Sequence, residues 1–158
     1  MRIALRPASE SDEGFLRELY RSTRERELAQ IPWNDAQKQA FVEMQFQAQK
    51  RHYASAFPEA SHDIICRDGE PAGRLYVDRR AEEIHILDMI VEPSQRRQGI
   101  ASAVLEELLR EADQAGKRAT IYVDELNPCP GVFEPLGFRQ KLRSGFQILL
   151  ERPPASRA

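Results

Sequence analysis

The spacing of apolar residues along the chain switches between helical and extended periods, and it predicts where helices and strands lie. After a short N-terminal strand, two helical segments follow, at residues 9–28 and 31–53. The second segment opens on a capping box, in which Asn34 caps the helix and Gln37 reaches back to the cap. We expect this helix to face the core with a weakly apolar stripe, formed by Phe41, Met44, Ala48 and His52.

Extended segments dominate the middle and the end of the chain. The turn signal Asp68-Gly69 lies between two short apolar runs and predicts a hairpin. Strands at residues 82–91 and 118–125 enclose the clearest helix, at residues 100–116. A short broken helix and closing strands complete the order β-α-α-β-β-β-α-β-α-β-β. This order predicts an α/β (α+β) fold, with a mixed sheet of about seven strands and helices on both faces.

Composition limits the classes of function that fit the chain. We expect a single domain at residues 1–152 and a frayed tail at residues 153–158, because 158 residues fit one core. The net charge of −2 gives no general case for nucleic-acid binding. Cys66 and Cys129 lack metal-ligand spacing, so we expect no metal. Without a signal-like N-terminus or an apolar run of about 20 residues, a cytoplasmic protein without a membrane partner is expected.

An unusual turn, Arg96-Arg97-Gln98-Gly99-Ile100-Ala101, joins the apolar strand to the clearest helix. Positive charge at a helix start opposes the helix dipole, which favours anions there. The free backbone amides of a first helical turn bind phosphate groups, and a glycine lets the backbone approach such a group closely. The turn therefore indicates a pyrophosphate site, although two arginines at a helix start are also found where they are merely solvated. It matches neither the P-loop nor the dinucleotide-binding pattern.

Together with its strand and helix, the turn resembles motif A of the GNAT superfamily of acyl-CoA-dependent N-acetyltransferases. The signature of that motif is [Q/R]-x-x-G-x-[G/A], which here reads Arg96, Gly99 and Ala101. The predicted element order is similar to the GNAT fold over most of the chain. Residues 127–138 resemble a second family segment, and residues 73–93 look like those of a bacterial branch of the superfamily.

The resemblance implies acetyl-CoA as the cosubstrate. In the family, the pantetheine arm pairs with the strand before motif A, where a bulge splays that strand from the next one. The amides of the first helical turn bind the pyrophosphate, and an asparagine lies near the thiol. The cofactor-binding residues implied here are Met89, Ile90, Val91, Arg96, Arg97, Gln98, Gly99, Ile100, Ala101, Ser102, Asn127 and Phe133.

Acetyl transfer to an amine needs a neutral amine, a polarised carbonyl and a stabilised leaving thiolate. The apolar strand supplies the candidate catalytic residues Glu83, His85 and Asp88. Strict alternation along the strand places Glu83, His85 and Met89 on one face and Asp88 on the other. Asp88 could act as a base through a water or bind a cationic amine, or it could form a structural pair with a nearby arginine such as Arg74.

The residue expected beside the thiolate differs from the family pattern. Many GNAT enzymes place a tyrosine there as general acid, and alignment on the Leu-Gly-Phe segment ending at Phe138 puts Phe133 at that position. Phenylalanine has no proton to donate. The general acid would then be another residue, such as Tyr122, or water. Cys129 takes a small-residue position of the family segment, for which we expect a packing role.

These patterns favour an N-acetyltransferase that moves an acetyl group directly from acetyl-CoA to a small-molecule or peptide amine. Candidate acceptor contacts on the first two helices and the loop between them are Glu25, Glu27, Trp33, Asp35, Gln45 and Tyr53. The alternative is a GNAT-fold module that binds acyl-CoA or a partner protein with little or no catalysis, which Phe133 and its flanking prolines would suit. By the same resemblance, a homodimer is one expected assembly.

Overall fold

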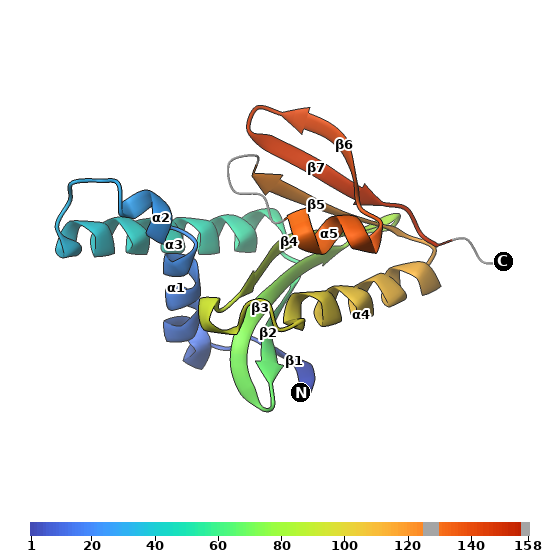
Figure 1. Cartoon of the computed structure of the whole chain (residues 1–158), viewed down its shortest axis with the longest axis horizontal. Coiled ribbons are helices and arrows are strands. Elements are labelled where there is room, and N and C mark those ends of the chain that lie inside the picture. The colour runs from blue at the N-terminus through green and yellow to red at the C-terminus, as the bar shows by residue number, and fades with distance from the viewer. Residues whose placement is uncertain (125–129, 156–158) are drawn as a thin grey trace.

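The structure is a computed structural model, and it describes residues 1–124 and 130–155. In this part of the chain, seven strands form one sheet in the order β1-β2-β3-β4-β5-β7-β6 (Figure 1). The strands are β1 (Ile3–Pro7), β2 (Ser61–Arg67), β3 (Glu70–Arg79), β4 (Glu83–Val91), β5 (Arg118–Asp124), β6 (Arg139–Ser144) and β7 (Gln147–Arg152). The helices are α1 (Glu13–Ser22), α2 (Glu25–Leu28), α3 (Asp35–Ala56), α4 (Ile100–Gln114) and α5 (Pro130–Phe133), with 3-10 turns at Glu10–Asp12, Pro93–Gln95 and Glu134–Leu136.

The sheet is mixed, as the element order predicts. Strands β4 and β5 are parallel and are joined by α4, whereas the other neighbouring strands are antiparallel. Helices α1, α2 and α3 pack on one face of the sheet, and α4 and α5 pack on the other (Figure 1). Each face therefore has its own apolar cluster, and the predicted two-sided α/β fold is confirmed.

Helix α4 forms where the periodic pattern is strongest. Its buried residues recur every three or four positions, so they lie on one face against the sheet; they are Ile100, Val104, Leu105, Leu108, Leu109 and Ala112. The helix ends before Gly116, whose φ of 67° suits the left-handed conformation common after a helix. A backbone N–H beyond the last strand, that of Ala155, donates to Asp113 Oδ1 near the end of α4 at 2.8 Å.

Two local predictions are confirmed in detail. At the start of α3, Gln37 N–H donates to Asn34 Oδ1 at 2.8 Å and Asn34 N–H donates to Gln37 Oε1 at 3.0 Å, which completes the capping box. Asp68 and Gly69 both have positive φ, 50° and 86°, as a two-residue hairpin turn between β2 and β3 requires.

Two predictions about the N-terminal helices are wrong. The segment at 9–28 is a 3-10 turn and two helices, because Ser22 and Thr23 turn their hydroxyls back onto the carbonyls of Leu19 and Tyr20, each at 2.6 Å, where α1 ends. In α3, the buried side chains are Val42 and Phe46, and Met44 is 60% exposed. Helix α3 has few apolar residues, so their spacing does not decide which side of the helix is buried. Contact with α1 decides it instead.

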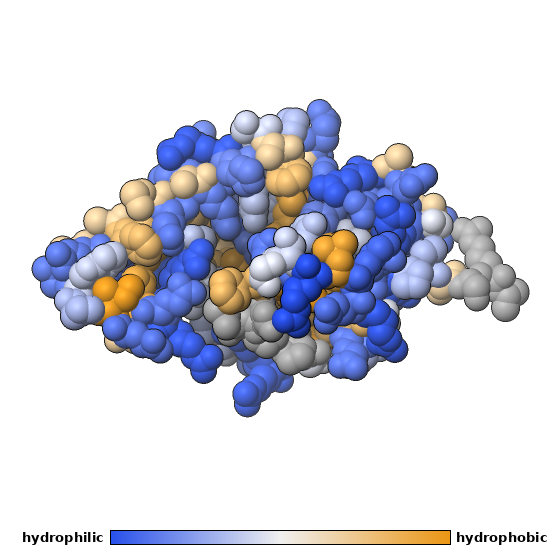
Figure 2. Space-filling view, turned by 90° about the horizontal axis from the view of Figure 1, so that it is seen from above, coloured by the Kyte–Doolittle hydropathy of each residue, from blue (hydrophilic) through white to orange (hydrophobic). Residues whose placement is uncertain are grey.

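The surface agrees with a composition of 30% charged residues. The face shown in Figure 2 is largely hydrophilic, and its apolar side chains lie in separate spots. Among the described residues, no helix is long and apolar enough to span a membrane. The same residues contain no group of three or more His, Cys, Asp or Glu side chains that could hold a metal ion.

Candidate active site

A bulge in β4 decides which side chains face each side of the sheet. Asp88 of β4 pairs with Tyr76 of β3, but Ile86 pairs with the next residue, Val77, so Leu87 is an extra residue in β4. An extra residue shifts the alternation by one position. Asp88 therefore lies on the same face as Glu83 and His85, which corrects the strict alternation expected from the sequence. Residues on the α4 side are Ile84, Ile86, Met89 and Val91.

Beyond the bulge, β4 and β5 separate. The two strands are paired in parallel between Glu83–Ile86 and Arg118–Ile121. Among the described residues, β4 and β5 are not paired with each other beyond Ile86 and Ile121, although β4 runs on to Val91 and β5 to Asp124. The end of β4 stays with β3, where Gly73 has no side chain; a Cβ there would collide with the carbonyl oxygen of Ile90. The backbone edge of β4 that faces β5 is thus left free to pair with an extended ligand. The expected bulge and splay are both present.

The N-terminus of α4 carries free donors and no acid. Gly99 is the N-cap with a φ of 81°, no side chain among the described residues accepts from the first turn, and that turn holds no Asp or Glu. The amides of the first turn have no partner within a helix. A Cβ on Gly99 would meet nothing within 4 Å, so its positive φ, rather than crowding, requires glycine there. Arg97 also has a positive φ, 63°, which is strained for a residue with a side chain.

Arginines surround this turn. The Nε of Arg96 donates to the carbonyl oxygen of Val91 at 3.1 Å, so its side chain connects the turn to the end of β4. Arg67 of β2 donates to Gln98 and, at 3.3 Å, to Gln95. Arg97 is exposed. Three positive charges therefore meet the positive end of the helix dipole, an arrangement that an anion would stabilise.

Asp88 is held in an ion pair beneath α3. Both Nε, at 3.1 Å, and Nη2 of Arg74 donate to Asp88 Oδ2, and Arg74 also donates to Gln49 of α3 at 2.8 Å. Arg74 is only 4% exposed. Beside this pair, the Tyr53 hydroxyl donates to the carbonyl oxygen of Leu87 at 3.3 Å. Burial, and then the charge of Asp88, raise the pKa of Tyr53 to about 12.

His85 and Glu83 belong to a second polar group, at the base of the splay. His85 Nδ1 lies 2.7 Å from Thr120 Oγ1 of β5, and the Thr120 hydroxyl donates to Glu83 at 3.2 Å. Burial, followed by the charge of Arg80, lowers the pKa of His85. Burial acts to raise the pKa of Glu83, but hydrogen bonds from Arg80 and Thr120, with nearby arginine charges, hold it below its ordinary value.

Comparison with known proteins agrees with this geometry. The model of the Acetyltransferase (GNAT) family matches residues 16–138. The chain belongs to the GNAT acetyltransferase family. A crystal structure of the PaiA N-acetyltransferase of Thermoplasma acidophilum in complex with coenzyme A has a TM-score of 0.73 at 17% identity, covering 97% of this chain and 99% of that one. The ribosomal-protein-S18-alanine N-acetyltransferase of Escherichia coli has a TM-score of 0.68 at 18% identity, covering 99% and 97%.

A third structure, an acetyltransferase from Thermus thermophilus, has a TM-score of 0.70 at 18% identity and covers 97% of each chain. At these identities the three structures support the GNAT fold. No match was found among curated proteins.

The GNAT residues expected at the thiol end are only partly described. Asn127 and Cys129 lie outside the described residues. Phe133 is 4% exposed and belongs to the core cluster on the α4 side of the sheet. Its ring meets Phe138 edge-on, with the centroids 5.4 Å apart. The ring is thus packed into the core on this side of the sheet, and the thiol-side role expected from the alignment stays a prediction. Tyr122, the alternative, is 48% exposed and directly follows Ile121, the last residue of β5 that pairs with β4.

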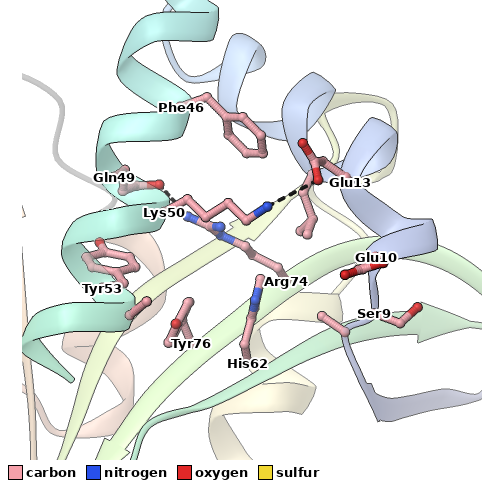
Figure 3. Close-up of a pocket in the computed structure, with 13 residues that line it drawn as sticks. Ser9, Glu10, Glu13, Phe46, Gln49, Lys50, Tyr53, His62, Arg74 and Tyr76 are labelled. Carbon is pink, nitrogen blue, oxygen red and sulfur yellow. Dashed lines mark hydrogen bonds and ion pairs between the residues drawn. The ribbon is translucent and has the colours of Figure 1, made fainter. Parts of the chain in front are cut away.

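A cavity of about 380 Å³ lies on the other side of the sheet, between α1, α3 and strands β2 and β3 (Figure 3). His62 and Tyr76 stack on its floor with ring centroids 4.4 Å apart, and Lys50 spans it to bind Glu13 at 3.1 Å (Figure 3). Burial, and then the charge of Arg74, lower the pKa of His62 to about 4. Its Nε2 is buried without a hydrogen-bond partner among the described residues.

Of the residues expected to contact the acceptor, Tyr53 lines this cavity. Gln45 instead accepts a hydrogen bond from Tyr20 at 3.4 Å, and the other four lie on α2, in the following loop or at the start of α3. Sequence reasoning missed His62 and Tyr76, because their stacking depends on the register of β2 against β3. It also missed Thr120, which reaches His85 only through the parallel register of β4 and β5.

Proposed function

We propose that this GNAT protein is an N-acetyltransferase that transfers an acetyl group from acetyl-CoA directly to an amine of a small molecule or peptide. One observation carries the proposal: the splay between β4 and β5 lies beside the arginine-flanked N-terminus of α4, whose N-cap, Gly99, has no side chain. The splay offers an unpaired strand edge, and the helix start offers unpaired amides with positive charge. A ligand with an extended amide arm and a pyrophosphate suits both parts.

The residues present suit both parts of such a ligand. The backbone of Met89, Ile90 and Val91 offers donors and acceptors along the free edge of β4. The amides from Gly99 to Ser102 can bind phosphate oxygens, and the Arg96 and Arg97 side chains add positive charge. The conflict between these arginines and the helix dipole is then resolved by the bound anion.

The chemistry that acetyl-CoA supplies is an activated thioester. The residues of this chain must then accept a proton from the amine and stabilise the thiolate. Glu83, His85 and Asp88 now share one face of β4, which is the face covered by α3, so the proposed acceptor approaches on that face. Tyr122 stands beside His85 at the base of the splay, with ring centroids 5.6 Å apart, and we propose its phenol as the proton donor to the thiolate.

The test of cofactor binding is a thermal shift with acetyl-CoA. Ligand at 100 times its Kd stabilises the folded state by about 2.7 kcal/mol. We expect Gly99→Glu to abolish this shift, because it brings a carboxylate and a strained backbone to the phosphate site. Gly116→Ala is the matched control, since Gly116 has a similar φ and equally open surroundings at the far end of α4. Absence of any shift at millimolar acetyl-CoA in the wild type would reject the proposal.

The test of transfer is thiol release with a panel of amines, namely amino acids, polyamines, aminoglycosides and peptides. The second candidate function, an acyl-CoA-binding module without efficient catalysis, is favoured by Phe133, which gives no phenol at the family's tyrosine position. Binding of acetyl-CoA without acetyl transfer to any amine of the panel would support this second function over the first.

A further inference from the structure

Three side chains from two strands form a hydrogen-bonded chain at the base of the splay. Glu83 and His85 lie two residues apart on β4, and Thr120 of β5 lies between them. His85 and Thr120 are both buried. Arg80 binds Glu83 at 2.9 Å, and Arg118 approaches it to 3.4 Å. The carboxylate is therefore surrounded by cationic groups that keep it ionised.

The protons available to the hydrogen bonds among Glu83, Thr120 and His85 fix the tautomer of His85. An ionised carboxylate only accepts hydrogen bonds, and a threonine hydroxyl has one proton to donate. Thr120 Oγ1 lies 3.2 Å from Glu83 Oε2, and the carboxylate is a stronger acceptor than the imidazole ring. The hydroxyl of Thr120 therefore donates its proton to Glu83. The contact of 2.7 Å between Thr120 Oγ1 and His85 Nδ1 then needs its proton from the ring. The neutral imidazole carries that proton on Nδ1, so Nε2 has a free lone pair.

His85 lies at the base of the splay, where a basic nitrogen could accept a proton from the acceptor amine. His85 pairs with Thr120 one position before the last parallel pair, Ile86 with Ile121, and the two strands separate directly beyond. The exposed ring of Tyr122 meets the His85 ring edge-on at this point. Asp88, the other candidate base, is bound by the buried Arg74 instead. Among the candidates on β4, His85 thus combines a position at the base of the splay with a basic nitrogen, Nε2, that has no hydrogen-bond partner among the described residues.

We propose that Thr120, held by Glu83, is a positioning residue that fixes His85 with its proton on Nδ1, so that His85 Nε2 accepts the proton of the acceptor amine. This inference rests on the proposed function. The amine nitrogen forms a bond to the thioester carbonyl carbon, and the C–S bond breaks with its electron pair left on sulfur. One proton leaves the nitrogen for Nε2, the thiolate takes a proton from Tyr122, the donor proposed above, and the imidazolium returns a proton through solvent to the Tyr122 phenolate. The products are an N-acetyl amide and the free thiol.

The charged groups around His85 set how readily it takes this proton. Arg80 disfavours the imidazolium, whereas Glu83 on β4 and Asp78 on β3 favour it. Arg80 is itself paired with Asp78 at 2.9 Å, and Arg118 is the further cation at Glu83. With burial, these groups leave His85 neutral at pH 7, the state that a base requires.

The first experiment measures the tautomer by long-range ¹H–¹⁵N correlation of the histidine rings in the full-length protein without ligand. The His85 signals are assigned by their loss in His85→Gln. We expect a protonated Nδ1 and an unprotonated Nε2 at pH 8 in the wild type and in Thr120→Ser, and a shift of the proton toward Nε2 in Thr120→Val. A wild-type ring protonated on Nε2 would overturn the proposal. So would a Thr120→Val ring identical to that of the wild type.

The second experiment measures thiol release from acetyl-CoA against pH, with the amine of the panel that reacts fastest. We expect His85→Gln to lower kcat by about 10²-fold, the low end for a positioned acid or base, while the KM for acetyl-CoA is kept. Thr120→Val should lower kcat less and move the acid limb of the pH profile, and Thr120→Ser should restore both. An unchanged kcat in His85→Gln would overturn the role of His85. Failure of every amine in the wild type would instead contradict the proposed function, and the ring tautomer would still be decided by the first experiment.

Discussion

The hydroxyl of Tyr53 donates to the carbonyl oxygen of Leu87, with 3.3 Å between the two oxygens. Tyr53 belongs to α3, and Leu87 is the residue that the bulge adds to β4. This contact connects the helix that covers one face of the sheet to the point where β4 begins to leave β5. The shape of the splay therefore depends on α3 as well as on the pairing of the strands.

Tyr53→Phe should loosen the bulge. Loss of one hydrogen bond is expected to lower the free energy of unfolding by about 1 kcal/mol. Because the carbonyl of Leu87 loses its partner, the amides of residues 87–89 should exchange hydrogen faster. Tyr20→Phe is the control, since Tyr20 bonds to Gln45 and Arg24 away from β4. Equal exchange at residues 87–89 in both variants would show that the contact does not hold the bulge.

Asp88→Asn should lower the free energy of unfolding. Arg74 keeps its charge in a buried site, and removal of the partner of a buried charge typically costs about 3–5 kcal/mol. We expect the lower end of this range in urea denaturation, because Asp88 is partly exposed and the oxygen of the new amide can still accept hydrogen bonds from Arg74. The double variant Arg74→Gln with Asp88→Asn should recover part of the loss. If Asp88→Asn kept full stability and lost acetyl transfer instead, Asp88 would be the base in place of His85.

The parts of this fold that the sequence predicts are those decided by neighbours along the chain. The capping box of α3, the turn at Asp68-Gly69 and the glycine before α4 each need only a few adjacent residues. The family motif is equally local, because Arg96, Gly99 and Ala101 span six positions. For the same reason, the spacing of these residues is enough to locate the proposed phosphate site along the chain.

The parts that the sequence does not predict depend on register between distant segments. A period of two along β4 cannot reveal an extra residue at Leu87, because the bulge arises from pairing with β3. Thr120 lies 35 positions from His85, and only the parallel register brings the two together. The inner face of α3 was also predicted wrongly, since its polar sequence leaves the choice to packing against α1.

His62 should make the protein less stable in acid. Its pKa is about 4 in the folded state and 6.5 ordinarily, so between these values the unfolded chain binds a proton that the folded chain does not. Stability therefore rises with pH across this window and is lost as the pH falls through it. His62→Phe keeps a ring stacked on Tyr76 and removes the titration, so its unfolding free energy should depend less on pH between 4 and 6.5.

The control for this pH dependence is His52→Phe, which changes an exposed histidine of α3 and should keep the wild-type slope. Urea denaturation at several pH values measures all three proteins. Parallel curves for the wild type and His62→Phe would contradict the prediction.

Phe133→Tyr distinguishes a core residue from a wall of the active site. The ring packs against Phe138 within the core, so a hydroxyl added there enters an apolar setting and should cost about 1–3 kcal/mol of stability. Thiol release should not increase, because the added hydroxyl enters the packed core around Phe138. Phe146→Tyr, at a side chain that is 66% exposed, controls for the added hydroxyl and should leave stability unchanged. A rise in transfer rate approaching 10²-fold, about the low end for a positioned acid, with stability kept, would instead place Phe133 at the thiol and restore the role given to it by the family alignment.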